Sequence, residues 1–295
     1  ALQIADHATA LQGLWALHGA GGLDDALAGQ LLAHPGEHVR TWVIRLLGDK
    51  GQVATPLATR FAELAAADPS VTVRAQLAAT ARRLPGPQAL PIVRELLRRE
   101  GDLADPFLPL LTWWALESKT LTDRATILEQ FATPAVWQQP TSRPQVLRLI
   151  RRYAAAGNRD GYMTCLALLQ AAHPAEHAAA LTALHQGLTE RSRGLTEINS
   201  AGLYDAVATV GAQPPRTARL EFEPLTPELR DLILKSWREQ PDTLRTRLAL
   251  EAGLEEPYQA LLARLQADQP AARTIEALTI LNDYGRENCL PRVLP

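Results

Sequence analysis

The sequence is poor in aromatic residues and cysteine, and it contains no long hydrophobic run. Aromatic residues make up 5% of the 295 residues whereas 46% are apolar, so the apolar content is mostly alanine and leucine. These two residues favour helices, whereas strands are enriched in β-branched and aromatic residues, so we exclude an all-β fold. No stretch of 18 or more uncharged apolar residues occurs, and we therefore expect no transmembrane helix.

An excess of charge of one sign is also missing. The chain has 30 basic and 32 acidic residues, which argues against a dedicated nucleic-acid binder. Cys165 and Cys289 are far apart and form no C-x-x-C motif of a zinc or haem site. The sequence contains no glycine-rich phosphate loop and no G-x-S-x-G motif. We therefore expect no catalytic residue, no metal and no cofactor in this region.

Two segments match the zinc-protease pattern H-x-x-E-H, namely 34–38 and 173–177. The pattern binds zinc when both histidines lie on one face of a helix. Here Pro35 and Pro174 directly follow the first histidine, and a proline at that place indicates the beginning of a helix. The sequence therefore favours helix caps over a metal site.

The most informative feature is a repeat with a period of 34 to 37 residues. His34-Pro35, Asp68-Pro69 and Asp105-Pro106 follow one another at this spacing, and each precedes a helical pattern of apolar residues. Aspartate caps helix N-termini and proline suits the first helical position. Two-helix units of this period are typical of an α-solenoid. We expect Arg40 and Arg74 each to pair with a turn aspartate of a neighbouring repeat.

Proline spacing and hydrophobic periodicity predict an all-α fold, an α-solenoid of HEAT-like antiparallel helix pairs. The pattern breaks at 191–225, so we expect a repeat array over 1–190, an irregular insertion or join over 191–225, and a continuation of the array over 226–295. Asp24, Asp25, Asp102 and Asp105 are interpreted as helix caps. The predicted helices are 7–18, 23–33, 38–47, 55–66, 71–84, 87–99, 106–117, 121–131, 143–156, 159–172, 175–190, 226–239, 242–252, 256–267 and 270–284.

Two groups of residues are candidates for a partner surface. Trp113 and Trp114 are adjacent, so on a helix they point about 100° apart, and one can be core while the other lines a groove. The alternative is that both pack between repeats. A basic run lies in the predicted helix 143–156 and could hold phosphate or an acidic partner. The alternative for this run is a solvated or salt-bridged helix face. The candidate surface comprises Trp113, Trp114, Glu117, Arg148, Arg151 and Arg152.

Five segments together resemble a known family. They are LWALHGAGGLDDAL, VR-x-x-x-x-RLLGD, DP-x-x-x-VR-x-QLA, LPLLTWWALE and LIRRYAAAGNRDGYMTCLALLQ, in this order. Over residues 8–190 the chain looks like the HEAT-repeat region of large secreted proteins of planctomycetes and verrucomicrobia, which are often labelled membrane-bound dehydrogenases. In that family a β-propeller typically precedes the repeats and a c-type haem domain follows. The resemblance implies an extracytoplasmic scaffold in a larger, redox-linked protein.

The chain departs from that family in two respects. It has no C-x-x-C-H haem motif and no room for a propeller, so neither haem binding nor dehydrogenase activity is carried over to these residues. We therefore expect a non-catalytic scaffold or protein-interaction module whose partner is a protein or a neighbouring domain of the same polypeptide. The alternative is a HEAT-like nucleic-acid-binding protein or DNA-repair glycosylase.

Overall fold

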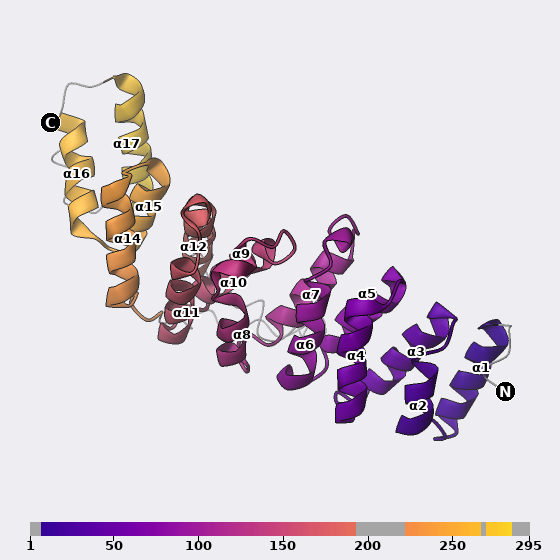
Figure 1. The fold of residues 1–295 in the computed structure, drawn as a ribbon. Helices are drawn as coiled ribbons and strands as arrows, with labels where there is room; N and C mark the ends of the chain where they lie inside the picture. The colour runs from indigo at the N-terminus through magenta and orange to yellow at the C-terminus, as the bar shows by residue number, and fades with distance from the viewer. Residues whose placement is uncertain (1–6, 193–221, 267–269, 285–295) are drawn as a thin grey trace, which may run out of the picture. The chain divides into compact units, whose positions relative to one another are not determined.

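The computed structural model describes residues 7–192, 222–266 and 270–284, and within them it is all-helical with no strand (Figure 1). The predicted all-α class is thus confirmed. The α-helices are α1 His7–Gly19, α2 Asp25–Leu31, α3 Glu37–Gly48, α4 Thr55–Ala67, α5 Val71–Ala81, α6 Gly86–Leu96, α7 Leu108–Glu117, α8 Arg124–Phe131, α9 Pro134–Trp137, α10 Arg143–Ala156, α11 Arg159–Gln170, α12 His177–Ser192, α14 Pro227–Glu239, α15 Thr243–Glu251, α16 Glu255–Gln266 and α17 Ala271–Tyr284. Short 3₁₀ helices cover Glu100–Asp102 and Pro174–Glu176.

The chain divides into two compact units, residues 1–145 and 146–295, and the division falls inside α10. Most of the predicted insertion or join at 191–225 lies outside the described residues.

In the first unit, helices that are two apart in the sequence pack side by side. The odd-numbered helices pack in the order α1, α3, α5, α7, and the even-numbered helices pack in the order α2, α4, α6 (Figure 1). The two rows also contact each other, in the pairs α2–α3, α4–α5, α5–α6 and α6–α7. The apolar residues between the rows form the core, where Val39, Val73 and Leu108 are almost fully buried near the starts of α3, α5 and α7. Burying one such side chain contributes roughly 1.5–3 kcal/mol.

The turns that precede α3, α5 and α7 share one geometry. A side chain before proline accepts a hydrogen bond from the backbone N–H two residues later: His34 Nδ1 from Gly36, Asp68 Oδ1 from Ser70, and Asp105 Oδ1 from Phe107, at 2.9–3.0 Å. In the second unit, His173 does the same with Ala175 at 3.3 Å. Such local side-chain acceptors stabilise turns, and at two of the four turns a histidine takes the place of the aspartate.

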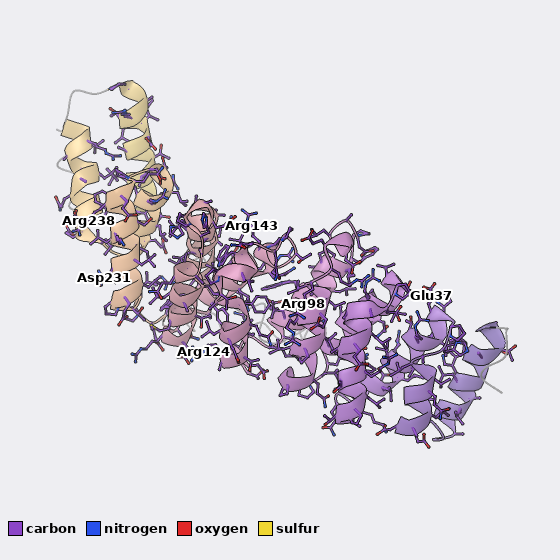
Figure 2. All side chains as sticks on the ribbon, in the orientation of Figure 1. Glu37, Arg98, Arg124, Arg143, Asp231 and Arg238 are labelled. Atoms are coloured by element: carbon purple, nitrogen blue, oxygen red, sulfur yellow. The ribbon has the colours of Figure 1, made fainter. Side chains whose placement is uncertain are left out.

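The sequence predicts Asp68 as the N-cap of the following helix and Pro69 as its first residue, and both assignments are wrong. The N-cap of α5 is Ser70, whose Oγ accepts from the Val73 N–H, and Pro69 lies before the helix rather than at its first position. The Ser70 hydroxyl also donates to Glu37 at the start of α3, which is labelled in Figure 2. The carboxylate of Asp68 is therefore available for a longer-range contact.

That contact is an arginine–aspartate pair that recurs at a fixed separation of 28 residues. Arg40 pairs with Asp68, and Arg74 pairs with Asp102, each through Nε and one further guanidinium nitrogen. A third nitrogen of Arg74 donates to the Asp68 carbonyl at 2.7 Å, so successive pairs are connected. The interpretation of Asp102 as a helix cap was wrong, because it is the partner of Arg74. Asp105 lies two residues before Phe107, the N-cap residue of α7, and its Oδ1 accepts from the Phe107 and Leu108 N–H groups.

Two further contacts in the first unit join residues that are 35 and 37 apart, which is close to the repeat period. Gln88 accepts from the Val53 N–H and donates to the Val53 carbonyl, at 3.1 and 2.7 Å. The buried Lys119 donates to the Arg82 carbonyl at 3.0 Å, beyond the end of α5. Burial lowers the pKa of Lys119, whereas the nearby Asp123 acts in the opposite direction.

In the second unit, α11 packs on α14, α12 on α15, and α17 on both α15 and α16. Glycines allow α12 and α11 to approach α10 closely. A Cβ on Gly187 would lie 2.6 Å from the Ala154 Cβ, and one on Gly161 would collide with the Tyr153 carbonyl. His185 of α12 is half-buried and hydrogen-bonds the Tyr284 hydroxyl at 3.0 Å, which joins α12 to α17.

The chain re-enters the described part at Phe222 and Glu223, which are held by the turn between α10 and α11. The Glu223 N–H donates to the Gly157 carbonyl at 2.9 Å, and the Tyr162 hydroxyl donates to the Glu223 carbonyl at 3.1 Å. The guanidinium of Arg191, near the end of α12, lies 5.3 Å from the centre of the Phe222 ring. Gly157 has φ +68°, and a side chain there would meet Phe222.

Candidate interaction surface

The first unit exposes an apolar stripe along α7. Phe107, Leu110 and Trp114 are 69%, 39% and 42% exposed, and their spacing of three and four residues places them on one helix face. We call these three residues the α7 stripe. Of the nine large apolar residues that are exposed in the described part of the chain, five lie between Leu103 and Leu121. Such a concentration, unlike scattered apolar residues, is typical of an interaction site.

The opposite face of α7 accounts for the position of the stripe. Leu108, Thr112, Ala115 and Leu116 are buried there against the neighbouring helices. Helix α7 is therefore fixed by its core face, and the stripe needs no rearrangement to be presented. Trp113 is half-buried beside it, as is Glu117, whereas Trp114 is exposed. The two adjacent indoles thus have different environments, and only that of Trp114 belongs to the stripe.

The three candidate arginines lie on α10, in the second unit, while the tryptophans lie in the first. Arg151 pairs with Glu190 of α12, with Nε 3.0 Å from Oε2, and this hydrogen bond raises the pKa of Arg151. Arg148 is half-buried, and burial lowers its pKa. Arg152 is also half-buried, and none of the three is without a partner. Arg151 therefore forms a salt bridge between α10 and α12.

Sequence reasoning missed a second aromatic group in the first unit. The Trp15 and Trp42 rings meet edge to face, with centroids 5.0 Å apart and planes at 77°, and the Arg45 guanidinium lies 5.1 Å from the Trp42 centroid. Trp15 is 43% exposed. Edge-to-face rings and a cation over an indole are both favourable contacts that fix side chains in place. The contact between Trp15 and Trp42 could have been predicted from the repeat, because they lie on α1 and α3, consecutive odd-numbered helices that pack together.

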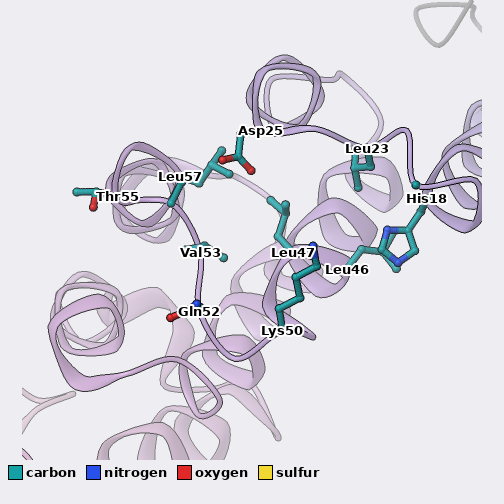
Figure 3. A pocket seen from close by; sticks show the side chains of 12 residues that line it. His18, Leu23, Asp25, Leu46, Leu47, Lys50, Gln52, Val53, Thr55 and Leu57 are labelled. Carbon is teal, nitrogen blue, oxygen red and sulfur yellow. The ribbon is translucent and has the colours of Figure 1, made fainter.

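A pocket of about 690 Å³ lies between the α1–α2 turn and the α3–α4 turn (Figure 3). In Figure 3, Leu46, Leu47 and Lys50 project into it, with His18 on one side and Thr55 on the other. Among the described residues, no hydrogen bond or ion pair joins His18, Asp25 and Lys50. At Val53 the pocket wall is held by Gln88, which hydrogen-bonds both backbone groups of Val53.

The structure describes all four histidines of the two H-x-x-E-H segments. The first histidine of each accepts a backbone N–H, and the second differs between them: His38 is exposed, while His177 Nε2 lies 3.2 Å from the Ala172 carbonyl. In the part of the chain that the structure describes, no group of three His, Cys, Asp or Glu side chains is placed to hold a metal ion. None of the described helices is both long and apolar enough to cross a bilayer.

Comparison with protein-family models, with curated proteins and with solved structures gives no match to this chain.

Proposed function

We propose that this chain is a HEAT-like α-solenoid region that works as a non-catalytic scaffold, and that the α7 stripe is its contact with a protein or with a neighbouring domain of the same polypeptide. The carrying observation is the stripe itself, three large apolar side chains exposed on a helix whose other face is buried. At protein interfaces a few residues supply most of the binding energy, and tryptophan is enriched among them, as Trp114 would be here.

The repeat contacts support the solenoid part of the proposal. In stacked repeats each unit contacts only its neighbours, so equivalent contacts recur at the repeat spacing. The Arg40–Asp68 and Arg74–Asp102 pairs, the turns before α3, α5 and α7, and the packing of helices two apart all have this property. The extracytoplasmic location and the redox-linked parent protein are proposed from the family resemblance alone.

Deletion of one repeat tests the solenoid. Removing residues 35–68 joins His34 to Pro69 and should restore an equivalent turn, so that α5 takes the place of α3 beside α1. We expect circular dichroism to show retained helix and a cooperative thermal transition, because stacked repeats rejoin across such a deletion. The matched control removes residues 35–61, which is out of phase, and should lose the transition. Equal loss of structure in both variants would contradict the solenoid.

Site-specific photo-crosslinking tests the interaction surface. A benzophenone side chain is placed at position 110 or 114 of the stripe, or at Glu63, an exposed position on α4. After irradiation in the native cells, we expect one discrete adduct from positions 110 and 114 that is absent from position 63. The same pattern of adducts from all three positions, or no adduct from the stripe, would refute the proposed contact surface.

A further inference from the structure

A groove of about 490 Å³ lies in the second unit, between α14 on one side and α11 and α12 on the other. Its floor is apolar and well packed: Leu166, Leu169 and Leu181 line it and are each less than 10% exposed. Leu232 of α14 adds a half-buried apolar wall. The groove is therefore a preformed apolar channel that would favour an apolar occupant.

The charges on α14 are segregated between its faces. Leu229, Ile233 and Trp237 form the buried face. The groove face carries Glu228, Asp231 and Glu239, against the single cation Lys235. The third face carries Arg230 and Arg238, and Figure 2 labels Asp231 and Arg238 on this helix. The groove side of α14 thus has a net charge of −2 although the helix as a whole is close to neutral.

Within the described part of the chain, the acidic groove face is poorly neutralised. Arg238, on the third face, is paired with Glu256 of α16, with Nε 3.1 Å from Oε1. Lys235 forms a long ion pair with Glu239, with Nζ 4.0 Å from Oε1. Among the described residues, neither Glu228 nor Asp231 has an ion-pair partner. Two exposed carboxylates beside an apolar channel would favour a partner with apolar and cationic groups on adjacent faces.

The groove follows α14 along nearly its full length. Its lining positions on this helix recur from 228 to 239 at helical spacing, which corresponds to about 16 Å at a rise of about 1.5 Å per residue. Three helical turns of continuous wall suit another helix better than a compact small molecule. We infer that this groove binds a basic amphipathic helix of a partner protein, with its apolar stripe on the leucines and its cations toward Glu228 and Asp231.

Peptide binding to the full chain tests the inference. The probe is a fluorescent 14-residue amphipathic helix of leucine and lysine, compared with the same peptide in which glutamate replaces lysine. By fluorescence anisotropy, we expect the lysine peptide to bind at least tenfold more tightly, and Glu228→Lys/Asp231→Lys to remove most of this preference. Hydrogen exchange should show new protection in α14 and α11. Equal binding of the two peptides would overturn the proposal.

Two matched variants separate a local groove from general electrostatics and from misfolding. Glu63→Lys/Glu129→Lys makes the same change in net charge on exposed positions of the first unit and should leave the affinity unchanged. Lys235→Glu should tighten binding of the lysine peptide by about threefold or more, a gain that loss of folding cannot produce. An equal effect of both double variants, or no gain from Lys235→Glu, would contradict the groove. Trp114→Ala should have no effect, so the inference stands or fails independently of the α7 stripe.

Discussion

Arg40 binds the carboxylate of Asp68 through two parallel hydrogen bonds of 2.7 and 2.8 Å, and its third nitrogen donates to the carbonyls of His34 and Pro35. One guanidinium therefore holds its own turn and the following turn at the same time. The planar fork of arginine suits this arrangement, and a lysine would supply no equivalent geometry. The side chains are only 10% and 2% exposed, so the pair is largely shielded from water.

Arg40→Met should therefore lower the free energy of unfolding by about 3–5 kcal/mol, because it leaves the Asp68 carboxylate buried without its cation. Urea denaturation followed by circular dichroism measures the change. The matched control is Arg83→Met, which removes the partner of Asp49 at a similar sequence separation but in an exposed pair. The Arg83→Met change should lower the free energy of unfolding by at most about 1 kcal/mol. Similar losses in the two variants would show that the buried pair has no special role.

Gly187→Ala should destabilise the second unit by about 1–3 kcal/mol. The added methyl group would overlap the Arg151 carbonyl and the Ala154 Cβ on α10, and overpacking of this kind costs more than the gain in helix propensity. Gly29→Ala on α2 is the control, because nothing lies within 4 Å of a Cβ there. It should be neutral or stabilising in the same thermal denaturation experiment. A stabilised Gly187→Ala chain would mean that α10 and α12 are farther apart than described.

Two buried tryptophans should respond differently to phenylalanine. Trp237 Nε1 donates to the Thr246 hydroxyl at 3.2 Å, whereas Trp137 Nε1 is buried with no hydrogen-bond partner among the described residues. Trp237→Phe removes a hydrogen bond, whereas Trp137→Phe removes an unsatisfied donor. We therefore expect Trp237→Phe to be the more destabilising change, by about 1–2 kcal/mol. The comparison uses urea midpoints, and the reverse order would contradict the assigned indole environments.

The Cys165 thiol should be inert in the native chain. It is fully buried and donates to the Ile150 carbonyl at 3.3 Å, and burial strongly raises its pKa. In a Cys289→Ser background, Ellman's reagent at pH 8 should react only after denaturation, because the thiolate is the reactive form. Rapid reaction of the folded chain would show that α11 does not shield the thiol.

The same thiol predicts a pH dependence of stability. Because its pKa is higher in the folded chain, the contribution of the protonated thiol is fully present below its unfolded pKa of about 8.5 and is lost as the pH rises above that value. The loss should be up to about 1.4 kcal/mol per pH unit between the two pKa values. Cys165→Ala should remove this part of the decline between pH 8.5 and 10, and an unchanged profile would contradict it.

The positions of the helices could be predicted from the sequence because prolines and capping residues mark the ends of helices locally. The predicted helix 143–156 coincides with α10, and the other predicted ends lie within a few residues of the observed ones. The sequence missed α9, which has only four residues. It also gave Asp102 the wrong role, because the Asp105-Pro106 dipeptide marks the turn whereas the arginine keeps its separation of 28 residues.

The surfaces were less accessible to sequence reasoning. From the sequence alone, apolar residues such as Phe107 and Leu110 are expected in the core. Their exposure becomes clear only from the packing of α7, which shows which face of the helix is covered. The acidic face of α14 is visible in its sequence spacing, but the leucines on the other side of the groove come from α11 and α12, some 50 residues and more away in the chain. A surface made by two distant segments leaves no local pattern.

The burial of Lys119 has a practical consequence for labelling this protein. The chain has only three lysines, and the amine of Lys119 is enclosed beside the Arg82 carbonyl, whereas Lys50 and Lys235 are exposed. Side-chain amine chemistry in native buffer should therefore modify one position in each unit: Lys50 in the pocket of the first and Lys235 in the groove of the second. A dye pair attached there would report the separation of the two units, and a bulky group at Lys235 would compete with an occupant of the groove.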